Sequence, residues 1–263
     1  MKYQSVRVSC MTSLDDFEIG HRRFNHRNLS YDYTFREIQR PLLENATIRR
    51  LHKYLELVQQ GKFPNELFEN PAVPRASMMK IRGLDKSQKQ YLQQYLFDQG
   101  IMQRSTSTEV SQLVQAVFRS FKDMEFQKKP DHGPVLKSIL LKDPRSVAIE
   151  LPVWKVNQEK AHCLTGHIDL VQVEKNEHEK YEIKILDYKP EGENRFIFCL
   201  PQVALYAKMM RAKLTPDESE ECEINCYIFD KKAMWRFQDD VLEKLDDKLA
   251  RYQIPRAWSF FLS

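Results

Sequence analysis

The sequence predicts an α/β protein in which a mixed central sheet is flanked by helices and preceded by a mainly helical N-terminal region. Helical periodicity occupies much of the first hundred residues, and three strand-like runs followed by a helix and a hairpin occupy the rest. Apolar residues form 42% and charged residues 30% of the 263-residue chain, the proportions of a soluble globular protein. We therefore expect an N-terminal helical region over 1–104 and an α/β core over 105–263.

Three helices are predicted before the first strand of the core. Apolar residues recur at intervals of three and four between 44 and 60, and Gly61 supplies a stop signal. A second helix with the same periodicity spans 85–98. Thr106 and Glu109 have the spacing of a capping box, so a third helix is predicted to begin there.

Three strands follow in the core. Residues 147–154 alternate between apolar positions on one face and a face that contains Glu150. Two further runs, 163–173 and 181–189, are separated by the polar segment 174–180, which is typical of a hairpin loop. The hairpin is expected to bring the last two strands side by side.

Asp187 and Lys189 lie on the face of their strand that begins apolar and is expected to point toward the core. An unpaired charge on such a face costs several kcal/mol or shifts its pKa, so a partner is needed. A divalent cation shared by Asp187 and by Asp169 of the preceding strand would supply that partner and remove the repulsion between the acids.

The last part of the chain predicts a helix, a hairpin and a final helix. Pro201 suits the first position of a helix, where its missing N–H costs nothing. Gln202 and Tyr206 then share one side of that helix near its free backbone donors, and packing of Tyr206 in the core is the alternative. A hairpin over 222–237 and a helix over 240–252 complete the pattern.

Three motifs in this order resemble the RecB-like branch of the PD-(D/E)xK nucleases. They are a glycine–aspartate motif at 166–169, a D-x-K strand at 187–189 and a Gln-x-x-x-Tyr helix at 202–206. The resemblance covers roughly 105–252 and implies a restriction-endonuclease-like core. It also implies a metal-dependent deoxyribonuclease, specifically an exonuclease favouring single-stranded DNA or ends, in which Gln202 and Tyr206 position the DNA strand.

The same resemblance assigns the chemistry to residues of the two central strands. Asp169 and Asp187, with the backbone carbonyl of Tyr188, would bind Mg²⁺ or Mn²⁺. Lys189 would orient the attacking water or stabilise the charge that grows on the phosphorane. Relatives that hold an iron–sulfur cluster carry a tight group of three cysteines, which the five scattered cysteines of this chain lack, so no cluster is predicted.

The third protein ligand is left open by the sequence. Many relatives present a metal-binding histidine on the helix before the first strand, and none occurs there in this chain. Glu109 is a candidate for the metal shell, with helix capping as its alternative, and Glu150 is a second candidate, with an exposed strand carboxylate as its alternative. His167 either contacts metal or DNA phosphate or is a hydrogen-bonded structural histidine. His132 falls in a predicted loop and is given no role.

A basic and aromatic segment between residues 21 and 53 is the other candidate for DNA contact. Its arginines, among them Arg22, Arg23 and Arg27, alternate with aromatic residues. Arginines neutralise phosphates and aromatic rings stack on unpaired bases, so the segment suits single-stranded DNA. A solvated helix surface with aromatics packed in the core is the alternative.

Composition and motifs bound the remaining expectations. The net charge of +4 does not oppose a polyanionic partner. No apolar run reaches the length of a membrane span or resembles a signal peptide, so an intracellular protein without membrane contact is expected. No Walker-type phosphate loop is present, which leaves any ATP motor to a helicase or another replication or repair partner.

The alternative function, motivated by the missing helix histidine, is a catalytically weak nucleic-acid-binding or scaffold subunit of a DNA-processing complex.

Overall fold

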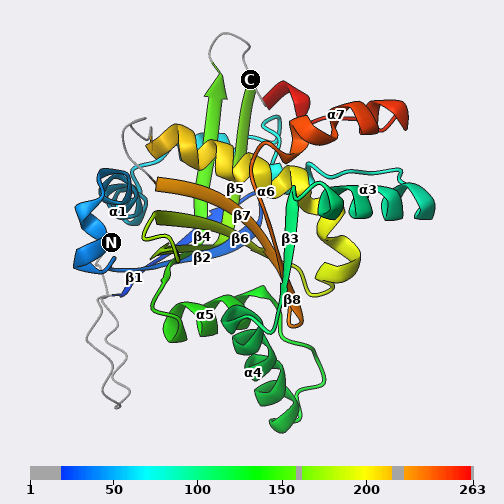
Figure 1. The fold of residues 1–263 in the computed structure, drawn as a ribbon. Helices are drawn as coiled ribbons and strands as arrows, with labels where there is room; N and C mark the ends of the chain where they lie inside the picture. Colours follow the sequence, from blue (N-terminus) through cyan, green and yellow to red (C-terminus); the bar gives the residue numbers. More distant parts are fainter. Residues whose placement is uncertain (1–18, 158–161, 215–221, 262–263) are drawn as a thin grey trace.

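The chain forms one mixed sheet of eight strands with helices on both faces (Figure 1). This computed structural model describes residues 19–157, 162–214 and 222–261. The strand order is β1-β2-β4-β5-β6-β7-β8-β3, and only β6 and β7 run parallel. The strands are β1 (Ile19–His26), β2 (Leu29–Arg36), β3 (Met102–Thr106), β4 (Ser146–Asn157), β5 (His162–Lys175), β6 (Tyr181–Tyr188), β7 (Cys222–Phe229) and β8 (Ala233–Phe237).

Seven α-helices lie in the described ranges, joined by short 3₁₀ turns. None of the helices described is both long and apolar enough to cross a membrane. The α-helices are α1 (Ala46–Gln59), α2 (Asn65–Glu69), α3 (Lys86–Asp98), α4 (Glu109–Asp123), α5 (His132–Lys142), α6 (Gly192–Leu214) and α7 (Val241–Arg251), and the 3₁₀ turns are Arg40–Glu44, Ala76–Met78 and Ser259–Phe261.

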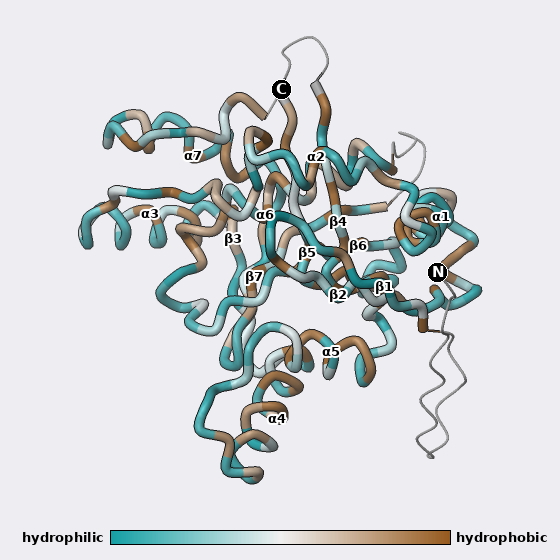
Figure 2. Tube along the Cα trace, turned by 180° about the vertical axis from the view of Figure 1, so that it is seen from behind, coloured by the Kyte–Doolittle hydropathy of each residue, from teal (hydrophilic) through white to brown (hydrophobic). Residues whose placement is uncertain are grey.

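The sheet is buried on both faces. Helices α1, α6 and α7 cover one face, and α4 and α5 cover the other (Figure 1). Hydrophobic and hydrophilic residues alternate along α4 and α5, as in helices with one buried side (Figure 2). In β6, Ile185 packs toward α6 and Leu186 toward α4 and α5. By the same alternation, Asp187 points to the α6 side.

The N-terminal region contains the predicted α1 and α3, but residues 19–36 form a β-hairpin that the sequence pattern did not predict. Arg27 and Asn28 at its turn have φ of 50° and 65°, the left-handed values that a tight two-residue hairpin turn needs. The hairpin extends the main sheet, because Thr34 of β2 pairs with Ile149 of β4. The predicted helix surface is therefore absent from residues 19–36, whereas Arg49, Arg50 and Lys53 of the same basic segment do lie exposed on α1.

The predicted division between residues 104 and 105 falls inside β3, which pairs with β8 at the opposite edge of the same sheet. Both ends of the N-terminal region are thus hydrogen-bonded to strands of the core. The strands contributed by this region flank the core strands rather than forming a sheet of their own.

Two predicted helix starts were wrong. Helix α4 begins at Glu109 with Thr108 as its N-cap, whose hydroxyl oxygen accepts a hydrogen bond from the Ser111 N–H at 3.2 Å. Helix α6 begins at Gly192, so Pro201 lies inside it rather than at its first turn. Gln202 consequently sits in mid-helix, away from any free backbone donors.

Candidate active site

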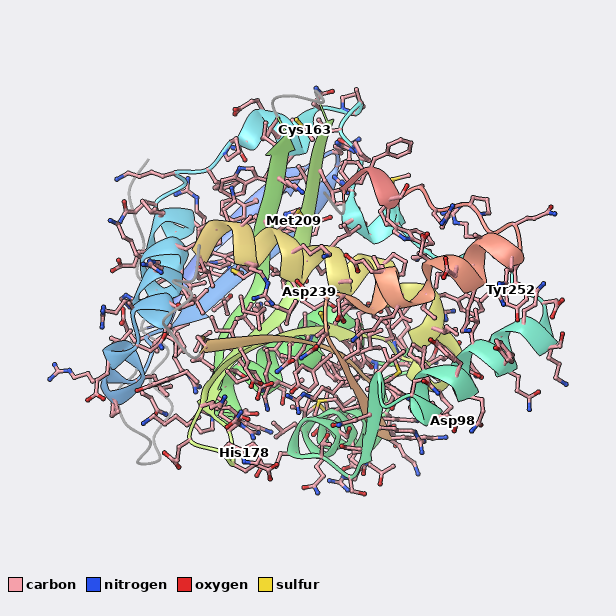
Figure 3. All side chains as sticks on the ribbon, turned by 45° about the horizontal axis from the view of Figure 1, so that its top comes forward. Asp98, Cys163, His178, Met209, Asp239 and Tyr252 are labelled. Carbon is pink, nitrogen blue, oxygen red and sulfur yellow. The ribbon has the colours of Figure 1, made fainter. Side chains whose placement is uncertain are left out.

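The two predicted acids lie side by side. Asp169 is in β5 and Asp187 is in β6, which pair antiparallel with Leu170 opposite Leu186. Cys163 at the start of β5 and His178 in the turn before β6 mark the two ends of this hairpin in Figure 3. The side chain of Asp187 is completely buried and that of Asp169 is 14% exposed. Like charges on neighbouring strands repel, so this pair needs compensation.

The amine of Lys189 provides part of that compensation. Its Nζ lies 2.5 Å from Oδ2 of Asp187. Burial alone would lower the pKa of Lys189, but the negative charges of Asp187 and Asp169 outweigh burial and raise the pKa well above its usual value. The Lys189 backbone N–H donates to the carbonyl of Phe229 at 2.9 Å, which fixes the end of β6 against β7. The amine is therefore a fixed positive charge.

Gln202 and Tyr206 lie beneath Asp187 rather than at the surface. The Gln202 amide donates to Oδ1 of Asp187 at 2.9 Å and to the Tyr206 hydroxyl at 3.2 Å. Their side chains belong to residues only 4% and 2% exposed, so they cannot touch a DNA strand that passes over the surface. The predicted DNA contact is corrected to an orienting role for the buried acid.

Gly166 of the first motif is explained by Tyr206 of the third. A methyl group at Gly166 would lie 2.4 Å from Cε1 of Tyr206, closer than carbon atoms approach in folded proteins. The absence of a side chain at this point of β5 allows α6 to pack closely and brings Gln202 to Asp187. Two motifs far apart in the sequence thus form one packing contact.

Replacing Gly166 with alanine is expected to destabilise the fold by about 1–3 kcal/mol, because the tyrosine ring must move. The shift should also disturb the hydrogen bond between Gln202 and Asp187. Urea unfolding measures the first effect. Gly133→Ala in α5 is the matched control, because its added methyl group meets nothing within 4 Å. Equal stability of both variants would contradict the proposed contact.

His132 belongs to the site, although the sequence pattern placed it in a loop without a role. It is the first residue of α5, and its Nε2 lies 3.0 Å from the carbonyl oxygen of Tyr188 and 3.8 Å from Oδ2 of Asp169. The signal that could have predicted this helix is Pro134, since proline is common in the first turn of a helix. A histidine thus stands beside the acids, on α5 instead of α4.

Glu150 is the third acid near the pair. Burial first, and the charges of Asp169, Asp32 and Asp187 after it, raise the pKa of Glu150 to about 8. Its φ of 54° lies in the left-handed region, which costs a non-glycine residue on the order of 1–3 kcal/mol and is found most often at functional sites. Glu150 is half-buried, so the alternative of an exposed strand carboxylate is wrong.

Glu109 has a different partner. Its carboxylate pairs with Arg145, which also binds Asp143 at 2.8 Å and Glu174 at 3.4 Å. The capping box with Thr106 is not formed, because Thr108 is the N-cap of α4. Glu109 instead joins an ion cluster around the start of β4.

His167 is a structural histidine, which was one of its two predicted roles. Its ring stacks on Tyr31 with centroids 3.6 Å apart, and its Nε2 lies 2.9 Å from Nδ1 of His26. Burial lowers the pKa of His167 well below its usual value, so the ring is neutral at pH 7. The ring packs between β2 and β5 and offers no charge to a phosphate.

The three arginines with a predicted DNA contact have different surroundings. Arg22 and Arg27 donate to backbone carbonyls and hold the β1–β2 hairpin against the segment after α1. Arg23 pairs with Asp32 at 2.8 Å, and its side chain is 63% exposed. Arg23 is the most exposed of the three, and a DNA contact by these arginines stays a prediction.

The donor set fits a hard divalent cation. Oxygen atoms of Asp169, Asp187 and the Tyr188 carbonyl, with Glu150 and His132 beside them, are ligands that suit Mg²⁺ and Mn²⁺. Burial, and then the charge of Asp187, raises the pKa of Asp169 to about 6, a cost that a bound cation would relieve. Within the described residues, no three acidic, histidine or cysteine side chains form a ready-made ligand group. The residues therefore suit a divalent cation by their oxygen donors and by their negative charge.

The chain matches no protein-family model, no curated protein and no solved structure. Its α/β architecture, with a mixed sheet flanked by helices, comes from the structure itself. Its function must be inferred from the residues gathered around the middle of β5 and the end of β6.

Proposed function

We propose that this chain is a metal-dependent nuclease that hydrolyses DNA phosphodiester bonds, as an exonuclease acting on single-stranded DNA or ends. One observation carries the proposal: two acids, one completely buried and the other 14% exposed, lie on neighbouring strands with a charged amine 2.5 Å from the buried one. The parallel pair β6 and β7, connected through α6, also suits the proposed restriction-endonuclease-like core.

The residues that would hold one or two Mg²⁺ or Mn²⁺ ions are Asp169, Asp187 and the carbonyl of Tyr188, with Glu150 and His132 adjacent. When bound, such a cation polarises the scissile phosphate and lowers the pKa of a bound water. Gln202 holds Asp187 in orientation through its amide, and the Tyr188 N–H donates to Oδ2 of Asp169 at 2.9 Å. Both acids are therefore fixed before the substrate arrives.

The protonation state of Lys189 determines which role its amine can have. The neighbouring carboxylates raise its pKa, so the amine stays protonated at neutral pH. A protonated amine donates hydrogen bonds and cannot accept a proton, which excludes it as the general base. It orients the attacking water and stabilises the negative charge that develops on the phosphorane.

The test uses purified protein and DNA labelled at the 5′ or the 3′ end, single-stranded or double-stranded, with Mg²⁺, Mn²⁺ or EDTA. Shortening that depends on metal and disappears in Lys189→Ala supports the nuclease and excludes a contaminating enzyme. Retention of DNA in a gel without products, under every metal, supports the scaffold alternative. That alternative was motivated by a missing histidine, and His132 now stands beside the acids.

His132→Ala is expected to raise the Mn²⁺ concentration needed for half-maximal cleavage by roughly tenfold or more, because the imidazole contacts Asp169 and the Tyr188 carbonyl. Metal titrations of the initial rate measure this shift. The adjacent Asp131→Ala is the matched control, since Asp131 is exposed and its side chain makes no capping hydrogen bond. Unchanged metal dependence in the histidine variant would remove His132 from the site.

A further inference from the structure

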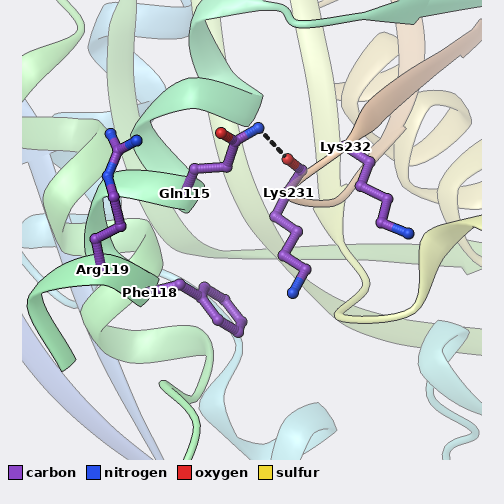
Figure 4. Close-up of a pocket in the computed structure, with 5 residues that line it drawn as sticks. All are labelled: Gln115, Phe118, Arg119, Lys231 and Lys232. Carbon is purple, nitrogen blue, oxygen red and sulfur yellow. Dashed lines mark hydrogen bonds between the residues drawn. The ribbon is translucent and has the colours of Figure 1, made fainter. Parts of the chain in front are cut away.

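A basic hollow lies between α4 and the turn that joins β7 to β8 (Figure 4). Its volume is about 310 Å³, and it is lined by Gln115, Phe118, Arg119, Lys231 and Lys232. Arg119, Lys231 and Lys232 are cationic, and none of them forms an ion pair with a carboxylate in the described ranges. Three uncompensated charges around one hollow favour an anionic ligand.

The turn that carries two of these cations is held in place. Asp230 is 3% exposed, and its Oδ1 accepts hydrogen bonds from the N–H of Lys232 at 2.6 Å and of Ala233 at 2.9 Å. Gln115 of α4 donates to the carbonyl of Lys231 at 2.7 Å. The backbone that presents the lysines is therefore fixed to α4 without any ligand.

The aromatic floor of the hollow positions one amine. Nζ of Lys231 lies 4.9 Å from the centroid of the Phe118 ring, within the range of a cation–π contact. In Figure 4 the amine of Lys231 reaches toward this ring, whereas the side chains of Arg119 and Lys232 extend to either side. A phosphate that enters the hollow would meet the amine of Lys231, which Phe118 holds in position, with Arg119 and Lys232 on either side.

The turn that carries the lysines begins at the same edge of the sheet as the end of β6. Strands β6 and β7 are parallel and end together, with Tyr188 opposite Phe229. The Lys189 N–H donates to the Phe229 carbonyl at 2.9 Å, and Lys231 follows Phe229 by two residues in the turn that Asp230 closes. A nucleic-acid strand that passes around this edge of the sheet would meet both Asp187, on the α6 side, and the hollow, on the α4 side.

We propose that this hollow binds backbone phosphates of the nucleic-acid strand whose scissile bond lies at Asp169, Asp187 and Lys189. The inference rests on the proposed nuclease function and extends it, because it gives the strand a second anchor outside the catalytic centre. Lysine and arginine neutralise phosphates, and an aromatic ring beside them suits a base. This combination next to the acids favours a nucleic acid over an acidic protein.

The experiment measures binding of fluorescein-labelled single-stranded DNA by anisotropy in EDTA, so that cleavage does not interfere. The hollow variant Arg119→Ala/Lys231→Ala/Lys232→Ala is expected to bind roughly tenfold more weakly at low salt. Its plot of log Kd against log salt should lose about 2 units of slope, as expected for three lost phosphate contacts on a single strand.

The matched control is Lys62→Ala/Arg82→Ala/Lys86→Ala, which removes the same charge from exposed residues outside the basic segment 21–53. It is expected to change the Kd by less than about twofold. Thermal melting of both variants must match the wild type, since all six substitutions retain the backbone contacts described above.

Several outcomes would overturn the proposal: equal binding by the hollow variant and the wild type, equal loss in both variants, or no measurable DNA binding by the wild-type chain. Equal competition from a glutamate-rich peptide of the same charge would also overturn it, by assigning the hollow to acidic proteins. Binding that depends on the hollow without cleavage under any metal would leave the hollow intact and reject the nuclease. Cleavage by the wild type together with unchanged DNA binding by the hollow variant would support the nuclease and reject the hollow as a DNA-binding site.

Discussion

Replacing Lys189 with alanine is expected to slow DNA cleavage by roughly 10²- to 10³-fold, the usual cost of losing one preorganised charge at a developing oxyanion. DNA affinity should change by less than about threefold, because one amine is a small part of a strand-long contact. Single-turnover rates at saturating Mg²⁺ give the first quantity, and anisotropy in EDTA gives the second. The pattern expected is lost chemistry with retained binding.

The control for this variant lies on the same strand. Lys184 is 12% exposed at its side chain, close to the 14% of Lys189, and its Nζ pairs with Glu174 at 2.5 Å. Lys184→Ala therefore removes a comparably buried ion pair on the opposite face of β6. It should lower stability without slowing cleavage. Similar rate losses in both variants would show that Lys189 acts through the fold rather than the chemistry.

Asp169→Asn is expected to abolish cleavage and, without metal, to make the protein more stable at pH 8. Burial and then the charge of Asp187 raise the pKa of Asp169 from 3.8 to about 6, so the folded protein holds this proton more tightly than the unfolded chain. This contribution to stability is fully present below pH 3.8 and is lost as the pH rises to about 6. Asparagine carries no charge and avoids the loss, a gain on the order of 2 kcal/mol.

Urea unfolding at pH 4 and pH 8, with and without MgCl₂, measures these effects. The variant should gain stability at pH 8 and little at pH 4, where the carboxyl is mostly protonated. Mg²⁺ should stabilise the wild type at pH 8 but not the variant, because one ligand is gone. Asp123→Asn, an exposed acid at the end of α4, should show none of this. A variant less stable at pH 8 would contradict the repulsion between the two acids.

The proximity of Asp169, Asp187 and Lys189, the proposed catalytic triplet, could be predicted from the sequence because its geometry is local. Period-two alternation placed Asp187 and Lys189 on one face, and the polar segment 174–180 indicated a hairpin to the strand of Asp169. The register that follows brings the acids together, with Leu170 opposite Leu186. Each step used residues close in sequence, and the mixed α/β class followed from the same periodicities.

The β1–β2 hairpin could not be predicted in this way. Strand β1 alternates between less and more buried residues, but the more buried ones are Gly20, Arg22, Phe24 and His26, which do not form an apolar stripe. Strand β2 ends in four consecutive buried residues, and the turn at Arg27 and Asn28 contains no glycine. Its place in the sheet depends on pairing with β4, more than one hundred residues later in the chain. Local sequence preferences carry no information about a partner at that distance.

The surroundings of the triplet were decided by tertiary structure alone. His132 reaches the Tyr188 carbonyl only because α5 packs against the sheet, and Gln202 reaches Asp187 only because α6 packs closely on Gly166. The sequence by itself determined which side chains carry charge and which strand face they share. Which groups meet them across the core was decided by the packing of helices on the sheet, since those contacts join residues that no local period connects.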